Sequence, residues 1–218
     1  MRPGLAGEGS DRYASNPRKT FGVRFAMQLI ADQRLVEMHD VLLETYAVND
    51  AMNQHLLAHL DPKAWRAELA GPEHKTRATG RHRTIAAIFA HLHNSRLVWL
   101  RQNAPHLKCP APLDTRRCTM KQAAAAHSKS SAQCLRMLTD ALSSAPDRKV
   151  TKFSRGWLRP WPAGGTMFAY MFSHEAHHRG QILMLAHQLG YRIPATTAAG
   201  IWHWDKLWKE HGFTTRPR

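Results

Sequence analysis

Two histidines four residues apart carry the clearest chemical signal in the chain. His174 and His178 lie in residues 170–189, YMFSHEAHHRGQILMLAHQL, whose apolar periodicity is that of a helix. Residues at this spacing share one helix face, about 6 Å apart. Met171, Ile182 and Leu185 lie on the same stripe, so we expect the face to point into a core.

Imidazoles that point into a core are costly unless a partner satisfies them. A divalent metal ion is one such partner, because neutral histidine is a common ligand and a pair one turn apart can hold one ion. Hydrogen bonds from core histidines to carbonyl groups or water are the alternative. Further histidines flank the pair, His177 among them, and we therefore favour the metal.

The elements that would position this pair are helical. Four long helices are predicted over residues 25–60, 84–103, 119–144 and 166–189, followed by a short C-terminal helix that ends near residue 211. Proline- and glycine-rich segments separate them, and no convincing strand pattern appears. We expect an all-α, antiparallel four-helix bundle over residues 25–213, after a loose basic extension over residues 1–24.

The second predicted helix offers a third metal ligand. It contains His91 and His93, which flank the apolar centre of the helix on opposite sides at similar angles. Periodicity therefore allows either histidine to point inward and does not distinguish them.

The bulk composition is that of a globular domain. The chain has 218 residues, 43% of them hydrophobic, and no apolar run long enough to span a bilayer. The first residues lack the apolar core of a secretory signal, so we expect a cytoplasmic protein without a membrane partner. Three cysteines without CxxC spacing argue against a disulfide framework and a thiolate zinc site.

The formal net charge of +15 admits nucleic acid, anionic membrane surfaces and acidic small molecules as partners. Lysine and arginine concentrate in connecting segments, around residues 75–83, 116–121 and 148–159. No basic helix face with interleaved aromatic residues is present. A solvated basic surface is the interpretation we favour.

Several motifs, in this order along the chain, resemble the DinB/YfiT superfamily of four-helix-bundle metalloproteins. They are Ala90-His91-Leu92, the fourth-helix sequence HEAHHRGQI from His174 to Ile182, and a closing GIWHW from Gly200, with Asn53 in a matching first-helix pattern. The resemblance covers about residues 40–208. It implies a three-histidine site at His91, His174 and His178, which selects His91 over His93.

The resemblance also implies a function. The ion in this superfamily is zinc or nickel, with a position left to water, and some members are transferases or isomerases that use a low-molecular-weight thiol. We therefore expect a metal-dependent thiol S-transferase, or a related hydrolase, in which metal-bound water or thiol is the reactive group. Its partners would be a small-molecule electrophile and a thiol. Trp157 and Trp161 suggest a homodimer contact or a pocket lid, although core packing explains them equally well.

Two rival interpretations remain. The residues from His174 to His178 also fit the HExxH motif of zinc proteases, with Glu175 as general base. The metzincin extension is missing, and Glu210 is the only glutamate downstream, which argues against a protease. Glu175 and Gln181 could instead be hydrogen-bond partners of the metal ligands, but for Glu175 we favour a solvated side chain. The second rival is a non-enzymatic basic bundle that binds nucleic acid or a protein partner and carries a structural metal.

Overall fold

Helices dominate the part of the chain that the structure describes. The computed structural model describes residues 38–69, 84–204 and 206, which all belong to one compact unit, Glu37–Arg218. Its long helices are α2 (Met38–His59), α3 (Ile85–Asn103), α4 (Met120–Leu142) and α5 (Gly165–Gln188). The predicted extension over residues 1–24 and the first part of the predicted first helix lie outside the described residues.

Short elements connect the long ones. A 3-10 turn, η1 (Pro62–Ala64), follows α2, and the strands β1 (Lys152–Phe153) and β2 (Trp161–Pro162) pair antiparallel before α5. Helix α6 (Ala195–Gly200) lies earlier than the predicted C-terminal helix, whose residues up to 211 are mostly outside the described part. The prediction of a mostly helical fold is confirmed.

Local sequence fixes the helix ends. Thr84 accepts a hydrogen bond from the Ala87 N–H at the start of α3, and Thr119 forms a capping box with Gln122 at the start of α4. At the end of α5, Gly190 has φ +82°, and the Tyr191 N–H donates to the Ala186 carbonyl. This is a Schellman cap, for which glycine is favoured because it adopts positive φ without steric cost.

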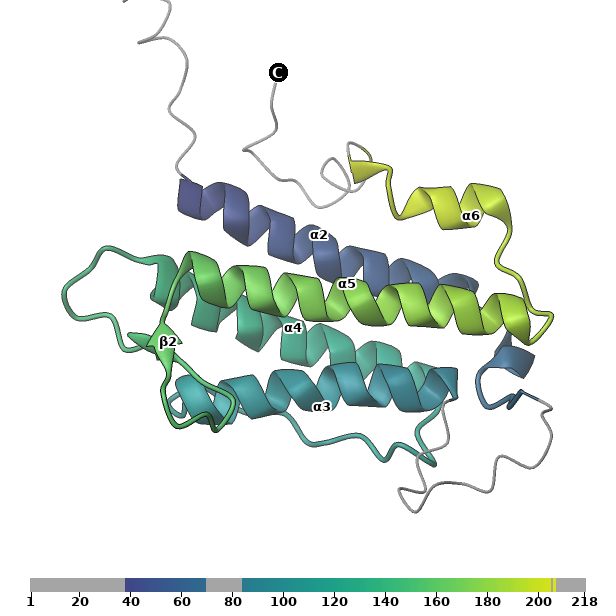
Figure 1. Cartoon of the computed structure of the whole chain (residues 1–218), viewed down its shortest axis with the longest axis horizontal. Coiled ribbons are helices and arrows are strands. Elements are labelled where there is room, and N and C mark those ends of the chain that lie inside the picture. The colour runs from purple at the N-terminus through teal and green to yellow at the C-terminus, as the bar shows by residue number, and fades with distance from the viewer. Residues whose placement is uncertain (1–37, 70–83, 205, 207–218) are drawn as a thin grey trace, which may run out of the picture. The chain divides into compact units, whose positions relative to one another are not determined.

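The long helices lie alongside one another, and two consecutive helices run in the same direction (Figure 1). Trp65, just after α2, accepts a backbone hydrogen bond from Ala86 in α3 and donates its indole N–H to the Cys118 carbonyl, just before α4. The end of α2 and the starts of α3 and α4 therefore meet. The expected antiparallel arrangement thus does not extend to α3 and α4.

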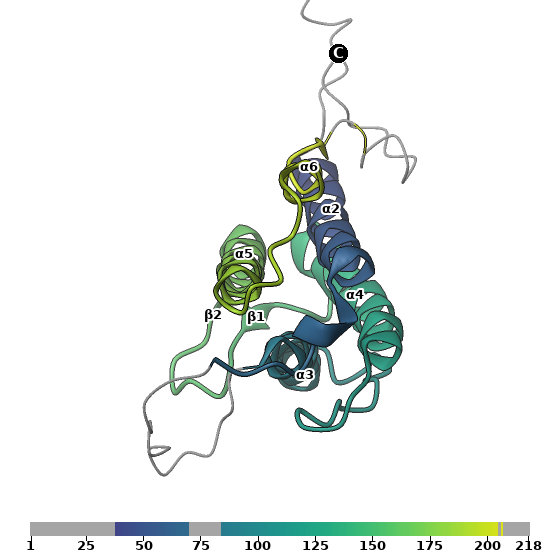
Figure 2. The ribbon, with the colours of Figure 1, turned by 90° about the vertical axis from the view of Figure 1, so that its right-hand side faces the viewer.

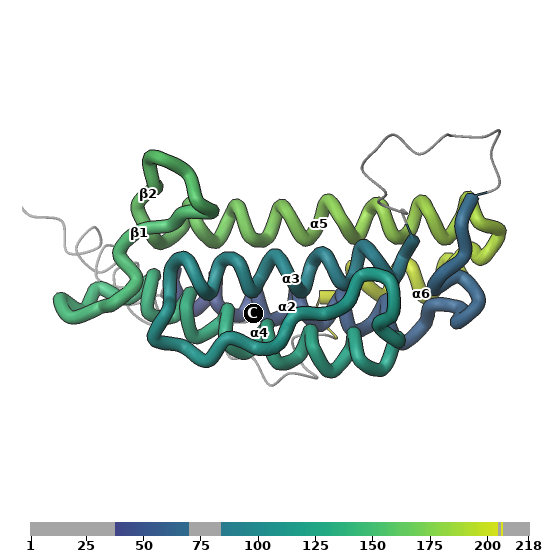
Figure 3. Tube along the Cα trace, turned by 90° about the horizontal axis from the view of Figure 1, so that it is seen from below, coloured from purple at the N-terminus to yellow at the C-terminus, as the bar shows by residue number. Residues whose placement is uncertain are grey.

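A long connection makes this topology feasible. Residues 104–119 run back along the length of the molecule (Figure 3), and an extended chain of that length easily spans the roughly 28 Å of a 19-residue helix. At the far end, Asn103 exchanges two hydrogen bonds with the backbone of Ser154, which ties the end of α3 to the segment before α5.

Helix α6 packs on α2, as the end-on view in Figure 2 shows. The His55 Nε2 atom lies 2.9 Å from the Thr197 carbonyl oxygen. A Cβ atom at Gly200 would lie 2.6 Å from the same His55 nitrogen, so glycine permits the close approach. No helix in the described ranges is long and apolar enough to cross a membrane.

The core contains two apolar clusters with a polar layer between them. One cluster includes Leu56, Phe89 and Ile182, and the other includes Trp99 and Met171. Along each long helix, buried polar residues occur where the chain passes from one cluster to the other: Asn49 and Asn53 in α2, Arg96 in α3, His127 and Ser130 in α4, and Glu175 and Arg179 in α5.

Candidate metal centre

Helices α3 and α5 bring three histidines together. His91 comes from α3, and His174 and His178 come from α5; one ligand nitrogen of each lies within 4.8 Å of the others. The ring centroids are 4.6 Å apart for His174 and His178, 4.7 Å for His91 and His178, and 5.4 Å for His91 and His174. These are the three residues that the resemblance selected.

His93, which periodicity could not separate from His91, lies elsewhere. It is fully buried, and its two ring nitrogens lie 3.1 Å from the Ser130 hydroxyl and 2.9 Å from the Ala111 carbonyl oxygen. Both nitrogens are thus occupied by protein groups. His93 is a core histidine that helps to hold the 104–119 connection against α3 and α4.

The three-histidine cluster fits a divalent ion. Bonds of 2.0–2.1 Å to one ion limit any two nitrogens to about 4.2 Å apart, so a small rotation of the rings closes the site. The Nδ1 atom of His174 is buried without a hydrogen-bond partner, which is rare for a buried polar atom and calls for a ligand. His91 is exposed and the other two histidines are half-buried, so solvent and small molecules can reach the cluster.

Gln181 orients one of the histidines. Its Oε1 atom lies 2.7 Å from Nδ1 of His178, and its Nε2 atom lies 2.9 Å from Nε2 of His177. The amide therefore accepts from His178 and donates to His177, which leaves Nε2 of His178 as its ligand atom. His177 is exposed and is not one of the three clustered histidines.

Two of the histidines, His174 and His178, are held in the neutral form that metal binding requires. Burial, followed by the neighbouring His178 and His91, lowers the pKa of His174 to about 4. Burial also lowers the pKa of His178, although its hydrogen bond to Gln181 opposes the shift. At neutral pH both rings are therefore deprotonated and able to donate a lone pair.

Glu175 differs from the prediction, because it is fully buried rather than solvated. Arg96 donates to both carboxylate oxygens, from Nε to Oε1 at 2.7 Å and from Nη2 to Oε2 at 2.6 Å. Tyr46, Asn49 and Asn53 donate the other three hydrogen bonds, at 3.1, 2.8 and 2.7 Å. A carboxylate engaged in this way cannot serve as the general base of a zinc protease.

Glu175 is held in its ionised form by Arg96. Burial alone would raise the pKa of Glu175, but the charge and hydrogen bonds of Arg96 outweigh burial and lower that pKa to about 2. Arg96 also donates to Asp50 and to the His127 carbonyl. The ion pair joins α3 to α5, the two helices that carry the three histidines.

Sequence reasoning missed this polar layer, although a signal was present. Asn49 and Asn53 are four residues apart in an apolar helix, and Arg96 interrupts the apolar face of α3. Polar residues at core positions of three helices indicate that they satisfy one another.

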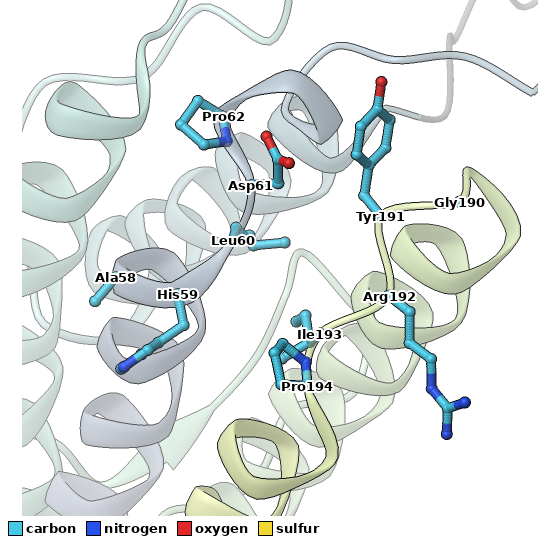
Figure 4. Close-up of a pocket in the computed structure, with 10 residues that line it drawn as sticks. All are labelled: Ala58, His59, Leu60, Asp61, Pro62, Gly190, Tyr191, Arg192, Ile193 and Pro194. Carbon is cyan, nitrogen blue, oxygen red and sulfur yellow. The ribbon is translucent and has the colours of Figure 1, made fainter.

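A pocket in the described part of the chain lies away from the histidines. It has a volume of about 520 Å³ and lies between the end of α2 and the segment after α5 (Figure 4). Its lining includes Leu60, Pro62, Tyr191 and Ile193, but none of the three clustered histidines. This pocket is therefore separate from the candidate metal site, which lies between α3 and α5.

Comparison with known families gives one match. The model of the DinB family matches residues 35–211 of the chain, which include all three clustered histidines. A search of curated proteins found no match.

Proposed function

The chain belongs to the DinB family, and on that premise we propose that it is a metal-dependent thiol S-transferase built on a four-helix bundle. In this proposal His91, His174 and His178 hold one zinc or nickel ion. When bound, the ion would favour the thiolate form of a low-molecular-weight thiol, whose proton would pass to solvent. The thiolate sulfur would then form a bond to a small-molecule electrophile, whose leaving group would depart with the bonding electrons. The observation that supports it is the convergence of three ligand nitrogens within 4.8 Å.

The donor set determines what the ion would supply. Three neutral imidazoles leave the charge of a divalent ion uncompensated and a coordination position open, so the ion lowers the pKa of a thiol and favours the thiolate near neutral pH. Burial lowers the pKa values of His174 and His178, which favours their neutral form, and Gln181 orients His178. Glu175 takes no proton in this scheme, because its oxygens accept five hydrogen bonds.

The test combines metal analysis with thiol-dependent turnover. We expect purified protein to retain close to one zinc or nickel ion per chain and to consume an electrophile only when a thiol such as mycothiol or bacillithiol is present. Chelation and His91→Ala should each remove both properties, whereas His93→Ala should keep them. Electrophile consumption that survives complete metal removal would contradict the proposal.

The net charge of +15 supports a second candidate, a non-enzymatic protein that binds nucleic acid and carries a structural metal. Binding of this kind weakens steeply with salt, because phosphate contacts release counterions. Duplex DNA titrated at increasing salt separates the two candidates. Tight, salt-sensitive binding without thiol-dependent turnover would favour the binder.

A further inference from the structure

One arginine beside the histidine cluster, Arg155, has no anionic partner among the residues that the structure describes. Arg155 is half-buried, and no carboxylate in the described ranges lies within ion-pair distance of it. Its Nη1 atom donates to the Tyr170 hydroxyl at 2.8 Å, while its Nε atom is buried without an acceptor. A buried N–H group without an acceptor is costly, and the cost falls when a ligand oxygen accepts from it.

Arg155 is separated from the cluster by a single aromatic ring. The guanidinium carbon lies 5.9 Å from the centroid of the Tyr170 ring. The same ring stacks on His174, with centroids 6.4 Å apart and an interplanar angle of 14°. A small molecule in contact with Arg155 and Tyr170 would therefore lie near His174, one of the three clustered histidines.

The hairpin around Arg155 adds an aromatic surface, which we call the tryptophan wall: Trp157, Trp161 and Tyr170. The ring centroids are 4.7 Å apart for Trp157 and Trp161, and 5.5 Å for Trp157 and Tyr170. Trp161 is 41% exposed, and the neighbouring Leu158 is 97% exposed. Exposed apolar side chains gathered beside a polar cluster are characteristic of a ligand-binding surface.

The backbone holds this surface in place. The hydroxyl of Ser154 accepts hydrogen bonds from the N–H groups of Gly156 and Trp157, both at 3.0 Å, and Gly156 has φ +87°. Asn103, at the end of α3, anchors the Ser154 backbone through two hydrogen bonds. Arg155 is therefore carried on a turn that is fixed to the helix bearing His91.

We propose that Arg155 and the tryptophan wall form a binding site for a carboxylate joined to an apolar, flat body, adjacent to the three-histidine cluster. The planar fork of arginine matches a carboxylate, and the aromatic rings contact the apolar part. The inference rests on the proposed function and specifies its substrate class. The carboxylate belongs either to the electrophile or to the thiol, and the experiment distinguishes these sources.

The test measures binding rather than turnover, with 2-naphthoate and its uncharged amide, 2-naphthamide, titrated against the tryptophan fluorescence of the full chain. We expect the wild type to bind the acid about tenfold or more tightly than the amide. Arg155→Met should remove that preference, and Trp161→Ala should weaken the binding of both ligands. Arg159→Met is the matched control, because Arg159 is an exposed arginine on the same segment, and it should leave the preference unchanged.

Two further arms separate the alternatives. In the first arm, 3-mercaptopropionate, which carries a carboxylate, and 2-mercaptoethanol, which does not, each compete with 2-naphthoate for the protein. Displacement of 2-naphthoate by 3-mercaptopropionate alone would assign the carboxylate to the thiol. Without such displacement, the carboxylate belongs to the electrophile. Titrations with and without the metal show whether the acid binds the ion instead. A preference for the acid that persists in Arg155→Met, or that disappears on metal removal, would overturn the inference.

Elemental analysis keeps the inference distinct from the proposed function. Arg155→Met should retain the metal content of the wild type, because the proposed metal ligands are His91, His174 and His178. A protein that lacks metal but still prefers the acid through Arg155 would contradict the proposed function alone. A protein that retains metal without that preference would contradict the inference alone.

Discussion

Glu175→Gln tests how strongly the buried ion pair stabilises the fold. The substitution removes the negative charge while it keeps the size of the side chain, and it leaves the buried Arg96 with Asp50 as its carboxylate partner. The pKa of Glu175 is lowered from 4.5 to about 2, and each pKa unit corresponds to about 1.4 kcal/mol. The carboxylate thus contributes roughly 3 kcal/mol, within the roughly 3–5 kcal/mol expected when one partner of a buried pair is removed.

Urea denaturation followed by circular dichroism gives the free energy of unfolding. We expect Glu175→Gln to lower it by about 3 kcal/mol, whereas Asp147→Asn, which neutralises an exposed carboxylate, should change it by less than about 0.5 kcal/mol. Arg96 and Glu175 contact each other directly, so the double variant Glu175→Gln/Arg96→Met should lose less free energy of unfolding than the sum of the two single losses.

The pH dependence of the free energy of unfolding gives an independent check that the ionised Glu175 stabilises the fold. Because folding lowers the pKa of Glu175, its contribution is fully present above pH about 4.5 and is lost as the pH falls toward about 2. Glu175→Gln should therefore flatten the stability curve in that window. Equal stability of Glu175→Gln and the wild type near neutral pH would refute the argument that this pair connects α3 to α5 energetically.

Three further predictions concern the histidines. His91→Ala should abolish metal retention in elemental analysis. His93→Ala should keep the metal and lower the midpoint of thermal unfolding, because the hydrogen bonds of His93 are lost. A metal-free His93→Ala protein would contradict the assignment of His91 as the ligand. Burial lowers the pKa of His127 to about 3, so stability should fall as the pH drops below about 6.5, and His127→Gln should weaken that dependence in denaturation curves measured from pH 7 to 4.5. Gln181→Ala removes the acceptor for His178 and should weaken metal affinity by about 10- to 100-fold in a competition titration; unchanged affinity would show that Gln181 has no orienting role.

Helix periodicity predicted which part of the chain carries the site. The spacing of His174 and His178 placed them on one helix face, and the structure has them on α5 with ring centroids 4.6 Å apart. Proline- and glycine-rich segments similarly indicated where the long helices are separated, because these residues act on the local backbone.

Features that depend on the packing of separate helices were beyond such reasoning. The helical wheel could not choose between His91 and His93, since the choice depends on which helix lies against each side of α3. The expectation of a solvated Glu175 was wrong for the same reason, because its partners lie on α2 and α3. The shared direction of α3 and α4 likewise follows from the path of residues 104–119, which periodicity does not predict.

The most direct test of the account is X-ray absorption spectroscopy of the purified protein at its metal edge, with elemental analysis of the same sample. The account predicts one divalent ion per chain with three imidazole nitrogens at about 2.0–2.1 Å, and a loss of one nitrogen or of the ion itself in His91→Ala. An ion without His91 among its ligands, or a correctly folded protein that binds no divalent ion, would contradict it.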